Sequence, residues 1–135
     1  MAENIKIDSV YVVDASFILS SILPDEKVLK PFQKILKLFE KNKVYFKAPE
    51  VLMYEIGNSL KSAVKQKRIA SNPATKLFSK IVTATIDYQK VDFKAVLDLS
   101  ITHDLSFYDS SYLYLAKVNK CKLLTLDKKL AEIAK

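Results

Sequence analysis

Two short apolar runs in this sequence are each followed by an aspartate. Val10–Val13 contains only β-branched and aromatic residues, which is typical of a strand buried on both faces. The run at 122–125 predicts a second buried strand near the end of the chain. Asp14 follows the first run directly, and Asp127 lies just beyond the second. Because ligands bind at the carboxyl ends of strands in open parallel sheets, both carboxylates are candidates for a functional site.

Helical periodicity and further apolar runs fill the chain between these two strands. Helices are predicted over 16–22, 28–41, 50–67, 92–102 and 128–135, and two more begin at 72 and 106. Short strands are predicted at 44–46 and 88–91. This alternation predicts a three-layer α/β/α sandwich around a central parallel sheet of four strands. Since no linker, repeat or low-complexity segment interrupts it, residues 1–135 are expected to form a single domain.

Two further acids lie along the apolar sides of predicted helices. Asp109 is in line with Tyr112 and Ala116, so its carboxylate shares the stripe that packs its helix. Glu55 lies at the edge of the apolar stripe of the 50–67 helix. Carboxylates packed together repel one another unless a cation neutralises them. The pattern therefore indicates a cation site built from an acidic quartet, namely Asp14, Glu55, Asp109 and Asp127.

Three of the four acids also have a purely structural interpretation, which the sequence leaves open. Asp14 is a suitable cap for the short helix that follows it. Ser106 and Asp109 have the S-x-x-D spacing of a capping box, with Asp in place of Glu or Gln. Glu55 could form an ion pair with Lys61 at the boundary of its helix. The repetition of an apolar strand followed by an acid favours chemistry over capping.

The composition adds an excess of positive charge. The chain has 22 basic and 15 acidic residues, a net charge of +7, which favours a polyanionic partner through counterion release. Arg68 is the only arginine, and this scarcity argues against a surface that reads base sequence. The 50–67 helix has a basic end, so we expect backbone contacts with RNA from Lys61, Lys65, Lys67 and Arg68. Basic residues also suit a helix carboxyl end through the helix dipole alone.

The same composition indicates an intracellular protein. The single cysteine, Cys121, cannot form an intramolecular disulfide, which fits a reducing compartment. No apolar run is long enough to span a bilayer, and residues 1–10 lack the order of a signal peptide. We therefore expect a cytoplasmic location and no membrane partner.

The ligand types in the acidic quartet restrict the chemistry. Oxygen ligands without histidine or cysteine favour Mg²⁺ or Mn²⁺ over zinc. Two such ions about 4 Å apart can activate water and stabilise the leaving oxygen when a phosphodiester bond is hydrolysed. The chain lacks the G-x-x-x-x-G-K-[ST] and G-x-G-x-x-G motifs of nucleotide-binding enzymes. A phosphotransfer receiver domain is also disfavoured, because Asp14 is followed by Ala15 and Ser16 rather than by a second acid.

Four blocks of the sequence resemble the signature blocks of the PIN-domain ribonucleases, above all the toxins of VapBC-type toxin–antitoxin pairs. In chain order, these blocks are Val12–Leu19, Ala48–Leu60, Leu105–Ala116 and Leu123–Asp127. By this resemblance, the acidic quartet holds the catalytic divalent metal, Mg²⁺ or Mn²⁺. The polar positions that support the metal ligands in the family correspond to Ser16, Asn58 and Thr125.

The resemblance implies a metal-dependent endoribonuclease that acts on single-stranded or structured RNA, usually as a homodimer, and toxin members are silenced by a small antitoxin. Two departures stand out. Ser110 occupies a position where the family often has alanine, and the chain stops soon after the 128–134 helix, where many members add an edge strand. A fifth strand is therefore left open. Two alternatives also remain: a non-catalytic PIN-fold module that binds RNA or protein, and a housekeeping nuclease with the same four blocks.

Overall fold

The central sheet brings the two strands that precede an aspartate side by side. The computed structural model describes residues 6–135. Its strands are β1 (Val10–Val13), β2 (Tyr45–Pro49), β3 (Ile86–Gln89) and β4 (Lys122–Leu124). They pair in the order β3-β2-β1-β4, and every neighbouring pair is parallel. The predicted parallel sheet of four strands is confirmed, and residues 6–135 contain no fifth strand.

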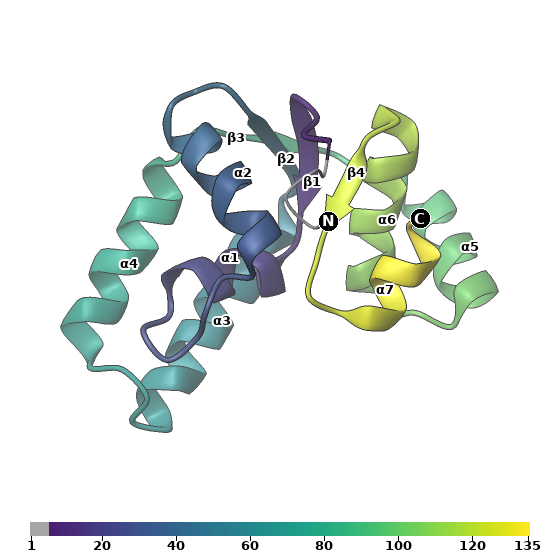
Figure 1. Cartoon of the computed structure of the whole chain (residues 1–135). Coiled ribbons are helices and arrows are strands. Elements are labelled where there is room, and N and C mark those ends of the chain that lie inside the picture. Colours follow the sequence, from purple (N-terminus) through teal and green to yellow (C-terminus); the bar gives the residue numbers. More distant parts are fainter. Residues whose placement is uncertain (1–5) are drawn as a thin grey trace.

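Helices cover both faces of this sheet. They are α1 (Ala15–Ile22), α2 (Lys30–Glu40), α3 (Val51–Lys65), α4 (Ser71–Thr83), α5 (Phe93–His103), α6 (Phe107–Asn119) and α7 (Lys128–Ile133). In Figure 1, α1 to α4 gather on one side of the strands and α5 to α7 on the other, which confirms the three-layer sandwich. None of these helices, over the described part of the chain, is long and apolar enough to cross a membrane.

Two predicted strands have different bounds in the structure. β3 occupies 86–89 rather than 88–91, because the buried Ile86 pairs in register with Phe46 of β2. β2 continues past Phe46 to Pro49, which pairs with Gln89 at the carboxyl ends of both strands. Consequently β2 and β3 end beside each other, at the same edge of the sheet as β1 and β4.

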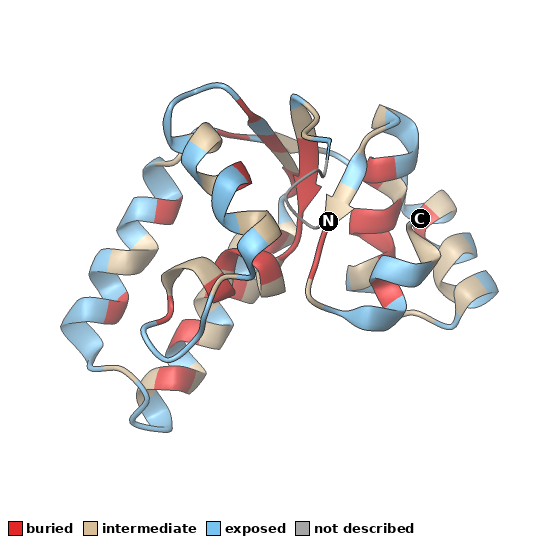
Figure 2. Cartoon of the chain, viewed as in Figure 1, coloured by how far each residue is buried: buried red, intermediate tan, exposed pale blue. Residues whose placement is uncertain are grey.

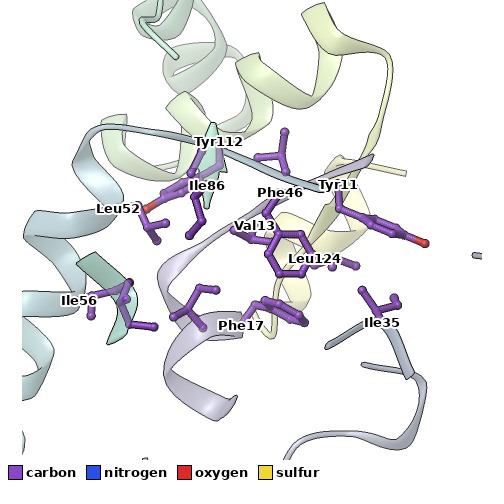
Figure 3. Packing of buried hydrophobic residues seen from close by; sticks show 14 of the residues in the cluster. Tyr11, Val13, Phe17, Ile35, Phe46, Leu52, Ile56, Ile86, Tyr112 and Leu124 are labelled. Atoms are coloured by element: carbon purple, nitrogen blue, oxygen red, sulfur yellow. The ribbon is translucent and has the colours of Figure 1, made fainter. Parts of the chain in front are cut away.

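Aromatic rings fill the space between β2 and the helices α1 and α2. Phe17 meets Phe46 edge to face with ring centroids 5.8 Å apart, and meets Phe32 in the same way at 5.1 Å. Phe39 stacks on Phe46 at 4.1 Å. Figure 3 shows Phe17 and Phe46 in the same cluster as Leu124 of β4, and Figure 2 shows that the buried residues concentrate in the strands and on the inner helix faces. This packing fixes the start of α1, and with it the position of Asp14.

One hydroxyl group on α6 is buried without a hydrogen-bond partner. Ser110 has an exposed fraction of 0%, and its Oγ contacts no donor or acceptor among the described residues. Its neighbour Ser111 is 5% exposed but donates its hydroxyl to the carbonyl oxygen of Tyr108 at 2.6 Å. A buried polar group without a partner destabilises a protein by about 1–3 kcal/mol. The buried hydroxyl of Ser110 therefore lowers the stability of the fold.

Replacing Ser110 with alanine is expected to raise the free energy of unfolding by about 1 kcal/mol. Ser111→Ala is the matched control, because it makes the same change in helix propensity while removing a hydroxyl that has a partner. Urea unfolding of both variants measures the difference, and Ser110→Ala should be the more stable of the two. Equal stability of the two variants would contradict the prediction.

Candidate active site

Asp14 is the most buried member of the acidic quartet, with an exposed fraction of 5%. It caps α1, since its Oδ1 accepts hydrogen bonds from Phe17 N at 2.9 Å and Ser16 Oγ at 2.7 Å. Thr125 Oγ1 donates to its second oxygen, Oδ2. Burial raises the pKa of Asp14 above its ordinary value, although these hydrogen bonds oppose the rise. The capping interpretation is therefore correct but incomplete, because Thr125 reaches the same carboxylate from the chain beyond β4.

Ser16 and Thr125, two of the predicted supporting residues, join the ends of β1 and β4 around this carboxylate. Ser16 Oγ accepts a hydrogen bond from the backbone N–H of Leu126 at 2.9 Å. Thr125 Oγ1 accepts one from the backbone N–H of Asp127 at 3.0 Å. The two hydroxyl oxygens lie 3.3 Å apart. Each hydroxyl therefore contacts both Asp14 and the segment that carries Asp127, so the relative position of these two acids is fixed.

Glu55 of α3 is held by a tyrosine on α6. The hydroxyl of Tyr112 donates to Glu55 Oε1 at 2.5 Å, and the Tyr112 ring is only 1% exposed. Burial raises the pKa of the half-buried Glu55, the bond from Tyr112 opposes the rise, and repulsion from Asp109 and Asp14 adds to it. The helical periodicity alone assigns Tyr112 to an apolar stripe and does not indicate this contact. The available signal was its hydroxyl group, which lies in line with Asp109 among otherwise apolar positions.

Two interpretations made from the sequence concern Glu55 and Asn58 of α3. Within residues 6–135, Glu55 forms no ion pair with Lys61, since its carboxylate faces Tyr112 instead. Asn58, the third predicted supporting residue, is exposed, and among the described residues no hydrogen bond joins it to the acidic quartet. A role for Asn58 at the site stays a prediction.

Asp109 and Asp127 both lie in the first turn or cap of a helix. The N–H of Asp109 donates to Ser106 Oγ at 2.9 Å, so Ser106 caps α6 as the sequence predicts. Burial and then repulsion from Asp127 raise the pKa of Asp109, while hydrogen bonding with Ser106 opposes the rise. Asp127 is exposed and caps α7, because its Oδ1 accepts from Leu130 N at 2.9 Å. Asp109 thus carries a half-buried charge beside a second carboxylate.

Asp109 connects the acidic quartet electrostatically. After burial, repulsion by Asp109 contributes to the raised pKa of both Asp14 and Glu55. Asp109 in turn feels the charge of Asp127. In the part of the chain that the structure describes, no three acidic, histidine or cysteine side chains approach closely enough to form a ready-made metal-binding group. The quartet is therefore a set of mutually repelling neighbours rather than a closed ligand shell.

The donor set of the quartet fits a hard divalent cation. Its members offer only carboxylate oxygens, which Mg²⁺ and Mn²⁺ prefer. Tyr112 donates its hydrogen bond to Oε1 of Glu55, so Oε2 is the oxygen that can bind a cation. Burial disfavours the charged forms of Asp14 and Asp109; repulsion by Asp109 adds to this effect at Asp14, and repulsion by Asp127 adds to it at Asp109. A bound cation would relieve both effects.

The predicted basic surface divides into two parts. Lys61, Lys65 and Lys67 are exposed on the second half of α3 and just beyond it. Arg68 instead forms ion pairs with Asp25, at 2.7 Å, and with Glu26, at 3.4 Å. Its hydrogen bonds lower the pKa of Asp25, so the guanidinium is already engaged in tying the loop after α1 to the end of α3. Arg68 is the weakest of the four candidates for an RNA contact.

Comparisons with known proteins identify the family and the fold of this chain. The model of the PIN domain family matches residues 11–135, a range that contains the whole acidic quartet. The protein named Exonuclease VapC9 from Pyrobaculum aerophilum is 26% identical over 120 residues, which cover 89% of this chain and 82% of that protein. The crystal structure of PAE2754, also from Pyrobaculum aerophilum, has the same fold, with a TM-score of 0.71 at 23% identity over 89% of this chain and 81% of that one. Because the family model spans nearly all of the sequence, the chain belongs to the PIN domain family.

Proposed function

We propose that this protein is a metal-dependent endoribonuclease that hydrolyses phosphodiester bonds in single-stranded RNA. The observation that carries the proposal is the hydrogen bonding that holds the acids of the quartet at the carboxyl ends of the parallel strands. Ser16 and Thr125 join Asp14 to the segment of Asp127, and the bond from Tyr112 joins Glu55 to α6, the helix of Asp109. Membership of the PIN domain family and the name of the 26% identical relative support nuclease activity. RNA as substrate, and Mg²⁺ or Mn²⁺ as the ion, are the finer parts of the proposal.

In this reaction, neighbouring side chains hold the carboxylates of the acidic quartet in place. Asp14, Glu55, Asp109 and Asp127 would hold the divalent ion, which would supply Lewis acidity and a water molecule of lowered pKa for hydrolysis. Ser16 and Thr125 hold Asp14 in place through their hydroxyl groups. Tyr112 holds Glu55 in one orientation, since its own ring is packed in the core. Preorganised ligands of this kind need little rearrangement when charge develops in the transition state.

The relative is named an exonuclease, whereas we propose cleavage within the RNA strand. The two modes differ in whether a free strand end is required. A circular single-stranded RNA has no end, so it serves as substrate only for the proposed endonuclease. Assays on circular and linear RNA of one sequence therefore separate the two modes.

A homodimer, and a small antitoxin that silences the enzyme, are further parts of the proposal. The VapC-type relative supports the toxin role. On α5, Phe93, Leu97 and Ile101 are 69%, 49% and 71% exposed, and their spacing of four residues places them along one face of the helix. An exposed apolar stripe of this kind is typical of a surface that another protein covers.

Asp109→Asn is expected to reduce RNA cleavage in Mn²⁺ by more than about 100-fold, because even residues that only support metal ligands contribute 10- to 100-fold. Without metal, the same variant should melt at the same or a higher temperature than the wild type, since it removes a charge that burial and Asp127 disfavour. The cleavage rate and the melting temperature, each with and without Mn²⁺, are measured for both proteins.

Asp98→Asn is the matched control, because Asp98 is an exposed acid on α5 and the substitution removes the same charge. This control should cleave RNA at the wild-type rate, and excess EDTA should stop cleavage by both active proteins. Near-normal cleavage by Asp109→Asn would remove Asp109 from the site. Undiminished cleavage in EDTA would contradict the metal-dependent reaction.

Replacing Lys61, Lys65 and Lys67 together with alanine is expected to weaken RNA binding and its dependence on salt. Each lost contact with a single-stranded backbone lowers the slope of log K against log salt by about 0.7, so three contacts would lower it by about 2. A triple replacement of exposed lysines on α2 and at its end, Lys34, Lys37 and Lys41, is the charge-matched control. Equal slopes for the two triple variants would place the RNA path elsewhere.

A further inference from the structure

A cavity of about 510 Å³ opens at the carboxyl ends of β2 and β3. Aromatic side chains from three helices line it, namely Tyr54 of α3, Phe93 of α5, and Phe107 and Tyr108 of α6. These rings have exposed fractions of 79%, 69%, 39% and 57%. Four large rings open to solvent in one concave site are unusual on a small domain, where apolar surface is normally scattered.

The order of strands places this aromatic cavity one strand away from the metal-binding acids. Asp14 follows β1, whereas Pro49 at the end of β2 and Gln89 at the end of β3 line the cavity. β1 and β2 are neighbours in the sheet, and neighbouring strands lie about 4.8 Å apart. A chain molecule bound at the acids can therefore reach the cavity, which lies one or two strand spacings away.

The helices confirm this adjacency independently. Tyr54 lines the cavity and is followed by Glu55, and Tyr108 lines it and is followed by Asp109. Consecutive helical residues point about 100° apart, so α3 and α6 each present an aromatic face and an acidic face side by side. The hydrogen bond between Tyr112 and Glu55 fixes the two helices against each other at this boundary.

We propose that the aromatic cavity binds one unpaired base of a single-stranded RNA, close to the phosphodiester bond that is cleaved. This inference rests on the proposed nuclease function and specifies how the substrate is held. Aromatic rings stack on any base, and this stacking is the main source of affinity in sites that bind single strands. Exposed Lys90 at the cavity provides a positive charge for the adjoining phosphate.

The polar lining favours binding by shape over recognition of one particular base. The amide of Gln89 is already engaged, because its Nε2 donates to Asp87 at 2.9 Å and its Oε1 accepts from Asn119 at 3.0 Å. Of the lining residues, Glu50 is the only acid. With few free groups to read a base edge, the cavity should accept all four bases and discriminate against a backbone without bases.

A second copy of this chain is the competing occupant, and the lining disfavours it. An interface that closed the cavity would bury Glu50 and Lys90, which lie on its wall, at a considerable desolvation cost. The apolar stripe of α5 continues away from the cavity through Leu97 and Ile101, neither of which lines it. A protein partner that covers Leu97 and Ile101 can therefore leave the cavity open to RNA.

The test measures binding without cleavage. The probes are a fluorescent 2′-O-methyl RNA strand of about 8 nucleotides, within the usual site sizes of single-strand binding proteins, and a strand of the same length and charge that lacks all bases. The variants are Tyr108→Ala, Tyr54→Ala and Tyr108→Phe. Tyr45→Ala is the matched control, because Tyr45 is 55% exposed at the start of β2, at the opposite end of the sheet.

Tyr108→Ala and Tyr54→Ala should each weaken binding of the strand with bases by about 5- to 150-fold, the range expected for the loss of one stacked base. Binding of the baseless strand should not change, and Tyr108→Phe and Tyr45→Ala should behave like the wild type. Unchanged affinity of both alanine variants for the strand with bases would overturn the proposal. It would also be overturned if these variants changed the oligomeric state in sedimentation while both strands bound as before.

The binding test can fail or succeed independently of the nuclease proposal. If base-dependent binding is lost in Tyr108→Ala but the wild type does not cleave RNA, the cavity assignment stands and the enzymatic assignment fails. If Asp109→Asn loses cleavage but the two alanine variants bind as the wild type does, the reverse holds.

Discussion

The buried carboxylate of Asp14 is the constraint on which the rest of the site depends. It ends β1, caps α1 and accepts a hydrogen bond from Thr125 beyond β4, so three parts of the chain meet at one charged group. At 5% exposure this group is far from the solvation that a charge requires. The hydrogen bonds compensate for part of that cost, and aromatic packing around Phe17 holds the donors in place. The geometry of β1, β4 and α1 is therefore set by the same residues that hold Asp14, the first acid of the proposed metal site.

Burial also opposes the charges of Glu55 and Asp109. Tyr112 holds Glu55 against α6, and Asp109 lies on that same helix, where the charge of Asp127 acts on it. Packing forces keep these side chains near one another although electrostatics opposes it. A divalent cation bound by the quartet, as we propose, would relieve this repulsion. The aromatic cavity lies one strand further along the same sheet edge, so one edge can serve both the phosphate and the base of a substrate.

Patterns in the sequence predict the features that depend on neighbours along the chain. The parallel sheet, the caps at Asp14 and Ser106, and the alignment of Asp109 with an apolar stripe all follow from local spacing. The bond between Tyr112 and Glu55 spans 57 residues, and the ion pair that engages Arg68 spans 43. Such contacts depend on how helices pack, which periodicity does not specify. The aromatic cavity was missed for the same reason, because its rings come from α3, α5 and α6 and form no motif in the sequence.

The central claim is that the acidic quartet forms one cation site. The most direct measurement is an X-ray structure of crystals soaked in Mn²⁺, with anomalous scattering used to locate the ion. The account predicts an Mn²⁺ peak between the carboxylates of Asp14 and Asp109, with Glu55 or Asp127 completing its ligands directly or through water. Saturating Mn²⁺ that leaves this position empty, or that binds only at acids outside the quartet, would contradict the account.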